Sequence, residues 1–116
     1  MISIKGFWHF KEEFAYGVKV GEARLFQNDN QISGHLVVNE KLTNGESMMV
    51  RTIISGYVHE NNIFLNDVGY TILAGEINTE YLLEERDGIL NIQGQIVGSV
   101  MDKDGVGGVF VMNRGG

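Results

Sequence analysis

The stretch Ile32-Ser33-Gly34-His35-Leu36 carries a pattern that recurs along this chain: an apolar residue, any residue, glycine, any residue and another apolar residue. The same pattern returns at residues 4–8, 54–58, 73–77, 92–96 and 106–110. Residues two apart on a strand share a face, so the glycine lies between two apolar side chains on the buried face. Glycine at such a position marks a strand that bends or that another group crosses closely. Repeated bends in one short chain favour a curled sheet, most simply a small barrel.

The rest of the chain is dominated by alternation of apolar and polar residues, and spacing typical of helices is nearly absent. Phe14, Tyr16, Val18 and Val20 alternate on one face, and the phase changes after Gly21, which predicts a β-bulge or a break between strands there. Residues 27–30, 60–62, 86–88 and 102–105 are rich in Asn, Asp and Gly and predict hairpin turns, with strands following at 89–97 and 106–112. Residues 39–47 are polar and predict the longest loop, and residues 78–86 fit either a short helix or a strand.

The hairpins predict antiparallel order, because parallel pairs need long crossovers. We therefore expect an all-β fold in which residues 1–116 form a single antiparallel up-and-down β-barrel domain of about eight to ten strands. A chain of 116 residues has room for one core.

Composition excludes several classes of function. A net charge of −6 disfavours a nucleic-acid partner, because such proteins need clustered Lys and Arg. The absence of cysteine removes disulfides, thiolate nucleophiles and Cys-based metal sites. No signal peptide is visible, and no stretch approaches the ~18 apolar residues of a membrane helix. We expect a cytoplasmic protein with no membrane partner.

The first long strand contains Gly6-Phe7-Trp8, and the last ends near Arg114. This pairing resembles the calycin superfamily, which includes the lipocalins, fatty-acid-binding proteins and avidins. The resemblance implies a calycin-like barrel in which Trp8 and Arg114 are structural, with the guanidinium packed over the indole at the closed end. Such a cation–π contact contributes about 0.5–2 kcal/mol. The tryptophans that line an avidin pocket have no counterparts here, so biotin is not expected.

The apolar faces provide the candidate binding residues. Those predicted to face the interior and contact a ligand are Phe10, Phe14, Tyr16, Met48, Thr52 and Tyr70. A barrel of about eight strands is either filled by its own side chains or keeps room for one small ligand. A ligand-binding barrel should hold a cavity of roughly 300 Å³ or more.

The opposite faces provide a candidate interface. The apolar residues predicted to point outward and to form it are Phe7, Ile53, Tyr57, Val109 and Val111. Closure of the barrel would make the first and last strands neighbours and bring Phe7 near Val109 and Val111. A contiguous outer apolar patch implies a partner, and we expect a homodimer.

No motif indicates catalysis, a metal or a cofactor. His9, His35 and His59 alternate onto the outer face, and their spacing is not that of a zinc site. Residues 102–105 begin like a calcium loop, but the later acidic ligand is missing. No serine lies in a nucleophile context, and no base is placed beside one. We therefore expect a protein that is not an enzyme.

Two functions fit these observations. The first is non-covalent binding of a small, largely apolar molecule inside the barrel. The alternative is a protein-interaction or inhibitory module with a solid core, which would use its outer apolar face or the 39–47 loop.

Overall fold

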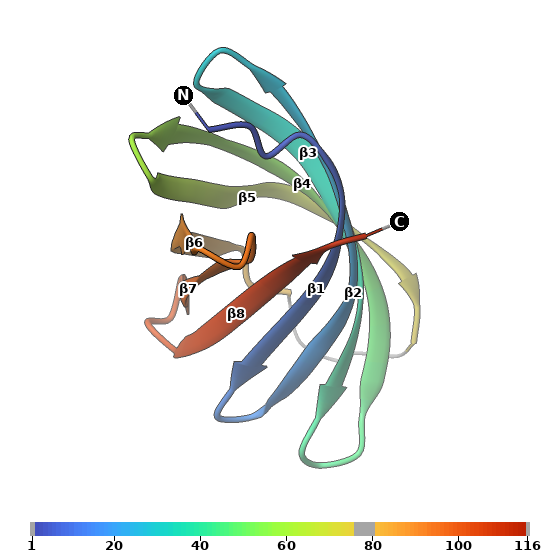
Figure 1. Ribbon diagram of the computed structural model, residues 1–116. Coiled ribbons are helices and arrows are strands. Elements are labelled where there is room, and N and C mark those ends of the chain that lie inside the picture. The colour runs from blue at the N-terminus through green and yellow to red at the C-terminus, as the bar shows by residue number, and fades with distance from the viewer. Residues whose placement is uncertain (1, 76–80, 116) are drawn as a thin grey trace.

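The computed structural model describes residues 2–75 and 81–115, which form one closed antiparallel barrel (Figure 1). The strands are β1 (Gly6–Phe14), β2 (Gly17–Asn28), β3 (Gln31–Leu42), β4 (Ser47–His59), β5 (Asn62–Ala74), β6 (Glu84–Leu90), β7 (Ile96–Asp102) and β8 (Gly107–Arg114). Each strand pairs with the next, and β8 pairs with β1. The predicted all-β, up-and-down barrel is confirmed.

Closure of the barrel places Trp8 opposite Arg114 and Phe14 opposite Gly108 across β1 and β8. The guanidinium carbon of Arg114 lies 4.3 Å from the centre of the Trp8 ring, and Trp8 is fully buried. The structure thus brings together the two residues on which the calycin resemblance rests.

The N-terminal segment covers this end of the barrel, at the top of Figure 1. Ile4 is fully buried, and its carbonyl oxygen accepts a hydrogen bond of 2.9 Å from the Trp8 indole. Arg114 donates to the carbonyl oxygens of Lys5 at 2.6 Å and Ser3 at 2.8 Å. We call this the closed end.

Apolar side chains fill the barrel from the closed end to its middle. The fully or almost fully buried ones include Trp8, Phe10, Leu25, Leu36, Ile54, Ile63, Leu65, Ile96, Phe110 and Met112. The rings of Phe10 and Phe110 stack with their centres 6.2 Å apart. This part of the interior is a solid core.

The opposite end, which we call the mouth, carries the β1–β2, β3–β4 and β7–β8 hairpins (Figure 1, bottom). Here β5 pairs with β6 only from Asn62 to Asn66, and the later residues of β5 pair with β4 alone. The β4–β5 ladder shifts register between Ile53 and Ile54, so Val68 is an extra residue and Asp67 turns into the barrel.

Glycines allow the strands to cross closely where the barrel curls. A Cβ atom on Gly21 would overlap the carbonyl oxygen of Val37, and one on Gly56 would overlap that of Phe64. No side chain fits at either position. Gly56 belongs to the repeated pattern, and its close contact agrees with the role expected of glycine there.

Three of the predicted hairpin turns are confirmed, and one is wrong. Turns join β2 to β3, β4 to β5 and β7 to β8, with Asp29 and Glu60 at φ 55° in the first two. The predicted turn at 86–88 instead lies in the middle of β6. The real turn spans residues 91–95, where the Asn91 side chain accepts hydrogen bonds from the backbone amides of Gln93 and Gln95. The strand predicted at 89–97 is therefore interrupted.

Other local predictions also need correction. β2 runs without a bulge or break at Gly21, because the inward face of this strand carries Lys19 and not Val18 or Val20. The loop predicted at 39–47 is limited to residues 43–46, since β3 continues to Leu42 and β4 begins at Ser47. Of the segment 78–86, residues 78–80 lie outside the described residues, and β6 begins at Glu84. Within the described ranges no helix is long and apolar enough to cross a membrane.

Candidate functional site

A row of charged side chains crosses the inner face of the barrel between the solid core and the mouth. Glu12 on β1 is the register partner of Lys19 on β2, Lys19 that of Glu40 on β3, and Glu40 that of Met48 on β4. All four are buried. Neighbouring strands thus place three ionisable groups side by side where a barrel normally carries apolar ones.

Lys19 reaches across the barrel instead of toward its neighbour Glu40. Its ammonium donates hydrogen bonds of 2.7 Å to the Tyr81 hydroxyl oxygen and 2.7 Å to Glu84 Oε1, and lies 3.6 Å from Glu12 Oε2. The Tyr81 ring lies under the same ammonium, 4.6 Å from ring centre to Nζ.

Arg86 forms the other side of a buried ion network that consists of Glu12, Lys19, Asp67, Tyr81, Glu84 and Arg86. Its Nη1 donates to Asp67 Oδ1 at 2.7 Å and its Nη2 to Glu84 Oε1 at 3.0 Å. Its guanidinium carbon lies 5.3 Å from the centre of the Phe10 ring, where the ion network meets the apolar core. The β4–β5 bulge is what turns Asp67 inward to meet it.

Glu12 is the poorly satisfied member of this network. It is fully buried, and neither of its carboxyl oxygens has a hydrogen bond among the described residues. Arg86 Nε is 3.4 Å from Oε1 but is itself without a hydrogen bond. Burial raises the pKa of Glu12 to about 8, against the opposing charges of Lys19 and Arg86. Glu12 is therefore mostly protonated at neutral pH.

The other groups respond to the same surroundings. Burial alone would lower the pKa of Lys19, but the nearby Tyr81, Glu84 and Glu12 outweigh burial and raise the pKa above its usual value. The ammonium therefore stays charged. Burial would raise the pKa of Glu84, but the cations of Lys19 and Arg86 outweigh it and lower the pKa. Lys19, Arg86 and Glu84 are therefore ionised in the folded protein.

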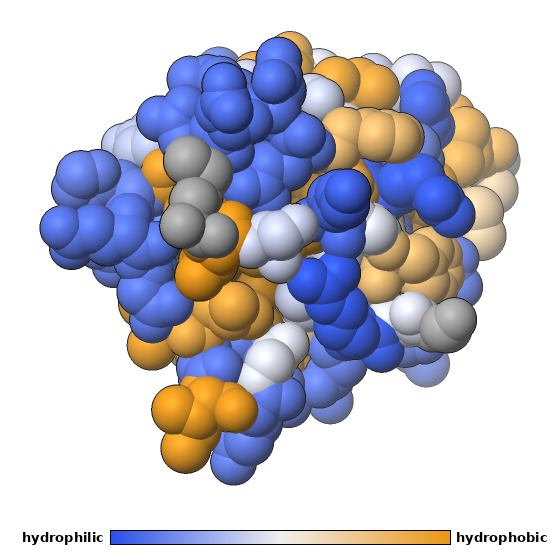
Figure 2. All heavy atoms as spheres, turned by 45° about the horizontal axis from the view of Figure 1, so that its top comes forward, coloured by the Kyte–Doolittle hydropathy of each residue, from blue (hydrophilic) through white to orange (hydrophobic). Residues whose placement is uncertain are grey.

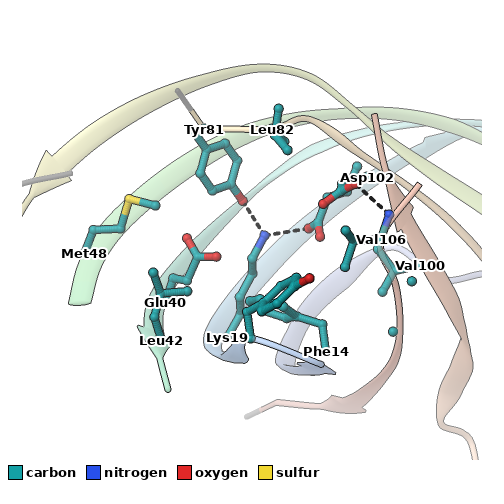
Figure 3. Close-up of a pocket in the computed structure, with 14 residues that line it drawn as sticks. Phe14, Lys19, Glu40, Leu42, Met48, Tyr81, Leu82, Val100, Asp102 and Val106 are labelled. Atoms are coloured by element: carbon teal, nitrogen blue, oxygen red, sulfur yellow. Dashed lines mark hydrogen bonds and ion pairs between the residues drawn. The ribbon is translucent and has the colours of Figure 1, made fainter. Parts of the chain in front are cut away.

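A cavity of about 270 Å³ opens above this network at the mouth (Figure 3). Its polar wall is made of Lys19, Glu40, Tyr81, Glu84 and Asp102. Its apolar wall is made of Phe14, Tyr16, Leu42, Met48, Leu82, Val100 and Val106, together with Gly107 and Gly108. The volume lies just under the 300 Å³ expected of a ligand-binding barrel, which limits an occupant to a small molecule.

Glu40 is the side chain in this cavity that the network leaves unpaired. It is 8% exposed, and among the described residues its carboxylate has neither a hydrogen-bond nor an ion-pair partner. Figure 3 shows it between Met48 and Lys19 and directed into the cavity, with no dashed line to a neighbour. Burial raises the pKa of Glu40, and the charge of Lys19 opposes that rise.

The predicted ligand-binding residues divide between core and mouth. Phe10 and Thr52 are buried below the cavity, while Phe14, Tyr16 and Met48 line it. Tyr16 is also 60% exposed at the rim.

Tyr70 lies outside the cavity wall and packs on Tyr81, with ring centres 5.2 Å apart. Sequence reasoning missed the polar wall altogether. One signal in the sequence could have found Lys19. Leu25 and Ala23 face the interior, and every second residue before them, Gly21 and then Lys19, lies on the same face.

The predicted interface residues do not lie together. Val111 is opposite Lys11 and Val109 is opposite Glu13, whereas Phe7 lies beside Gly115, so the expected closeness of Phe7 to the two valines is wrong.

Ile53 and Tyr57 lie on β4, which is separated from β8 by intervening strands in either direction. On the face that Figure 2 turns forward, hydrophobic residues alternate with hydrophilic ones. The homodimer stays a prediction.

The described part of the chain holds no group of three or more His, Asp or Glu side chains arranged to bind a metal ion. His9 and His59 are exposed on the outer face, and His35 is half-buried there.

The fold and the site together define a small antiparallel barrel with a solid base and a partly charged cavity at its mouth. No protein-family model matches the chain, and no curated protein matches it. Solved structures of designed barrels do match over nearly the whole chain.

A redesigned barrel, mFAP1, bound to DFHBI is similar with a TM-score of 0.65 and 11% identity, over 95% of this chain and 94% of that one. A second structure, EF1p2_mFAP2b bound to DFHBI, has a TM-score of 0.62 and 11% identity, over 96% and 93%. A fluorescence-activating β-barrel designed de novo has a TM-score of 0.58 and 13% identity, over 97% and 94%. At these identities the likeness concerns the fold alone.

Proposed function

We propose that this protein binds a small, largely apolar molecule non-covalently in the mouth cavity. The observation that carries the proposal is the change in the interior along the barrel axis. Apolar side chains fill the closed end and the middle, whereas about 270 Å³ stays open at the mouth. Binding sites in barrels of this size are typically found at the mouth.

The walls of the cavity suit such a guest. Phe14, Leu42, Met48 and Val100 supply apolar contact, and Lys19, Glu40, Tyr81, Glu84 and Asp102 supply polar groups. An occupant would bury its apolar body against the first set and direct one polar end to the second. The two similar barrels bound to DFHBI support this proposal, since they show that the architecture can hold a small molecule.

A thermal-shift screen of small apolar and amphipathic molecules tests the proposal. A related group of compounds should raise the melting temperature, because a ligand that binds only the folded state stabilises it. The decisive comparison uses Val106→Trp, which places a large side chain at the rim, and Val20→Trp, which makes the same change at an exposed position on β2.

Compounds that bind in the mouth should lose their effect in Val106→Trp and keep it in Val20→Trp. Compounds that stabilise both variants equally would show that binding occurs elsewhere. A screen without any stabilising compound would contradict the proposal.

A further inference from the structure

We propose that the ligand of the mouth cavity carries a cationic nitrogen, as in a small amphipathic amine, and that Glu40 binds this group. The inference rests on the proposed function, which supplies the site, and it adds the chemical class of the ligand. It is carried by a buried carboxylate that faces the cavity without a partner among the described residues.

Glu40 carries a nearly buried carboxylate that has no hydrogen-bond partner among the described residues. A carboxylate that is taken out of water without hydrogen bonds is strongly disfavoured, and buried charges in proteins are paired. Glu40 is 8% exposed and has no such partner within the part of the chain that the structure describes, so only solvent in the cavity reaches its carboxyl oxygens. A ligand that fills the cavity displaces this solvent and must supply a hydrogen-bond donor in its place.

Lys19 does not donate a hydrogen bond to Glu40. Lys19 is the register neighbour of Glu40, yet its ammonium donates to Tyr81 and Glu84 and approaches Glu12. Two of its three N–H groups are therefore taken by Tyr81 and Glu84, and none donates to Glu40 among the described residues.

The interior of the barrel carries an excess of acidic groups. The buried charged residues are Lys19, Arg86, Glu12, Glu40, Asp67 and Glu84. Even with Glu12 protonated, the carboxylates of Glu40, Asp67 and Glu84 outnumber the cations of Lys19 and Arg86, and Asp102 adds a further carboxylate at the rim. The low-dielectric surroundings strengthen the attraction of this excess for a cation.

The shape of the site sets the rest of the ligand. Glu40 is flanked by Met48, its register partner on β4, and by Leu42 on its own strand. An ammonium at Glu40 would thus place an attached chain or ring against Leu42, Met48 and Phe14. The cavity of about 270 Å³ accommodates a single ring with a short alkyl chain.

Three probes with one body and different ends test the inference: phenylbutylammonium, phenylbutanol and phenylbutanoate. Affinities are measured by calorimetry or by NMR titration at neutral pH. The ammonium should bind about tenfold or more tightly than the alcohol, because a charge-assisted hydrogen bond is stronger than a neutral one. The carboxylate should bind most weakly.

Glu40→Gln supplies the residue-level test, and Glu22→Gln, an exposed residue on the outer face of β2, is the matched control. Glu40→Gln should weaken the ammonium about tenfold and leave the alcohol nearly unchanged, which also shows that the variant is folded. Glu22→Gln removes the same charge and should change neither affinity.

The outcomes separate a failure of the cation assignment from a failure of the proposed function. If the alcohol binds and the ammonium is no tighter, or if Glu40→Gln leaves the ammonium affinity unchanged, the assignment to a cation is wrong while the binding site stands. If phenylbutanoate binds most tightly, the cavity selects anions and the inference is overturned. If none of the three probes binds, the inference fails, and the screen with Val106→Trp then decides the proposed function independently.

Discussion

Replacement of Glu12 by glutamine should change how the stability of the barrel depends on pH. The pKa of Glu12 is raised from 4.5 to about 8 by burial in the folded protein. Between these values the native state holds the proton more tightly than the unfolded chain, so the Glu12 contribution to stability falls as pH rises. Glutamine has the same shape and cannot ionise, so it removes this contribution.

The size of the effect follows from linkage. A pKa difference of one unit corresponds to about 1.4 kcal/mol. Between about pH 5 and about pH 7 the unfolded carboxyl is ionised while the native one retains its proton, so Glu12→Gln should gain about 2–3 kcal/mol of stability relative to the wild type over this range. Below about pH 4 the pH-dependent difference should vanish, because Glu12 is then protonated in both the native and the unfolded state.

Urea unfolding at a series of pH values measures this difference. Trp8 is the single tryptophan and is fully buried, so its fluorescence reports unfolding of the closed end, away from the substitution. Glu13→Gln, on the exposed side of the same strand, is the control for removal of a charge.

A difference that stays constant with pH would refute the reasoning. It would mean that Glu12 is ionised in the folded protein and that Lys19 and Arg86 compensate its burial fully. A variant that loses stability as pH rises would mean that those cations lower the pKa of Glu12.

Three further substitutions test how the closed end and the buried ion network stabilise the barrel. In each case the free energy of unfolding is measured in urea by circular dichroism. Trp8→Ala should cost about 3–5 kcal/mol, because it empties the base of the core, and a loss under ~1 kcal/mol would contradict its structural role. Arg114→Ala should cost less, about 1 kcal/mol, since its contacts lie at the exposed edge, and a loss equal to that of Trp8→Ala would show that the guanidinium holds the closed end. Arg86→Met should cost about 3–5 kcal/mol, because it leaves Asp67 and Glu84 buried without this cation, and a neutral result would show that water already reaches these carboxylates.

The architecture of the barrel could be predicted because it depends on local rules. Alternation gives strands, and short turns such as those at Asp29 and Glu60 give antiparallel neighbours. Glycines such as Gly56 sit where backbones cross, and their recurrence indicated a curled sheet. These features depend on residues close in the sequence, so the sequence alone shows them.

The turn at 86–88 was predicted wrongly because contacts distant in the sequence outweighed a local signal. Asp-Gly is a strong hairpin signal, but Asp87 and Gly88 continue β6, whose inward residues pair with groups on other strands. Tertiary contacts of Arg86 therefore overrode the local turn preference.

What the sequence by itself determined is a single all-β barrel, its hairpin order and an apolar base that contains Trp8. What only the tertiary structure decided is the polar half of the interior. Lys19 points inward because Tyr81 and Glu84, more than sixty positions away, accept its hydrogen bonds. A lysine between two valines reads as an exposed residue until those partners are known, since burial of a charge is tolerated only when it is paired. The period-two pattern back from Leu25 can place Lys19 on the inner face, but which groups pair with it, and that Glu40 is left over from that pairing, depends on closure of the strands into a barrel.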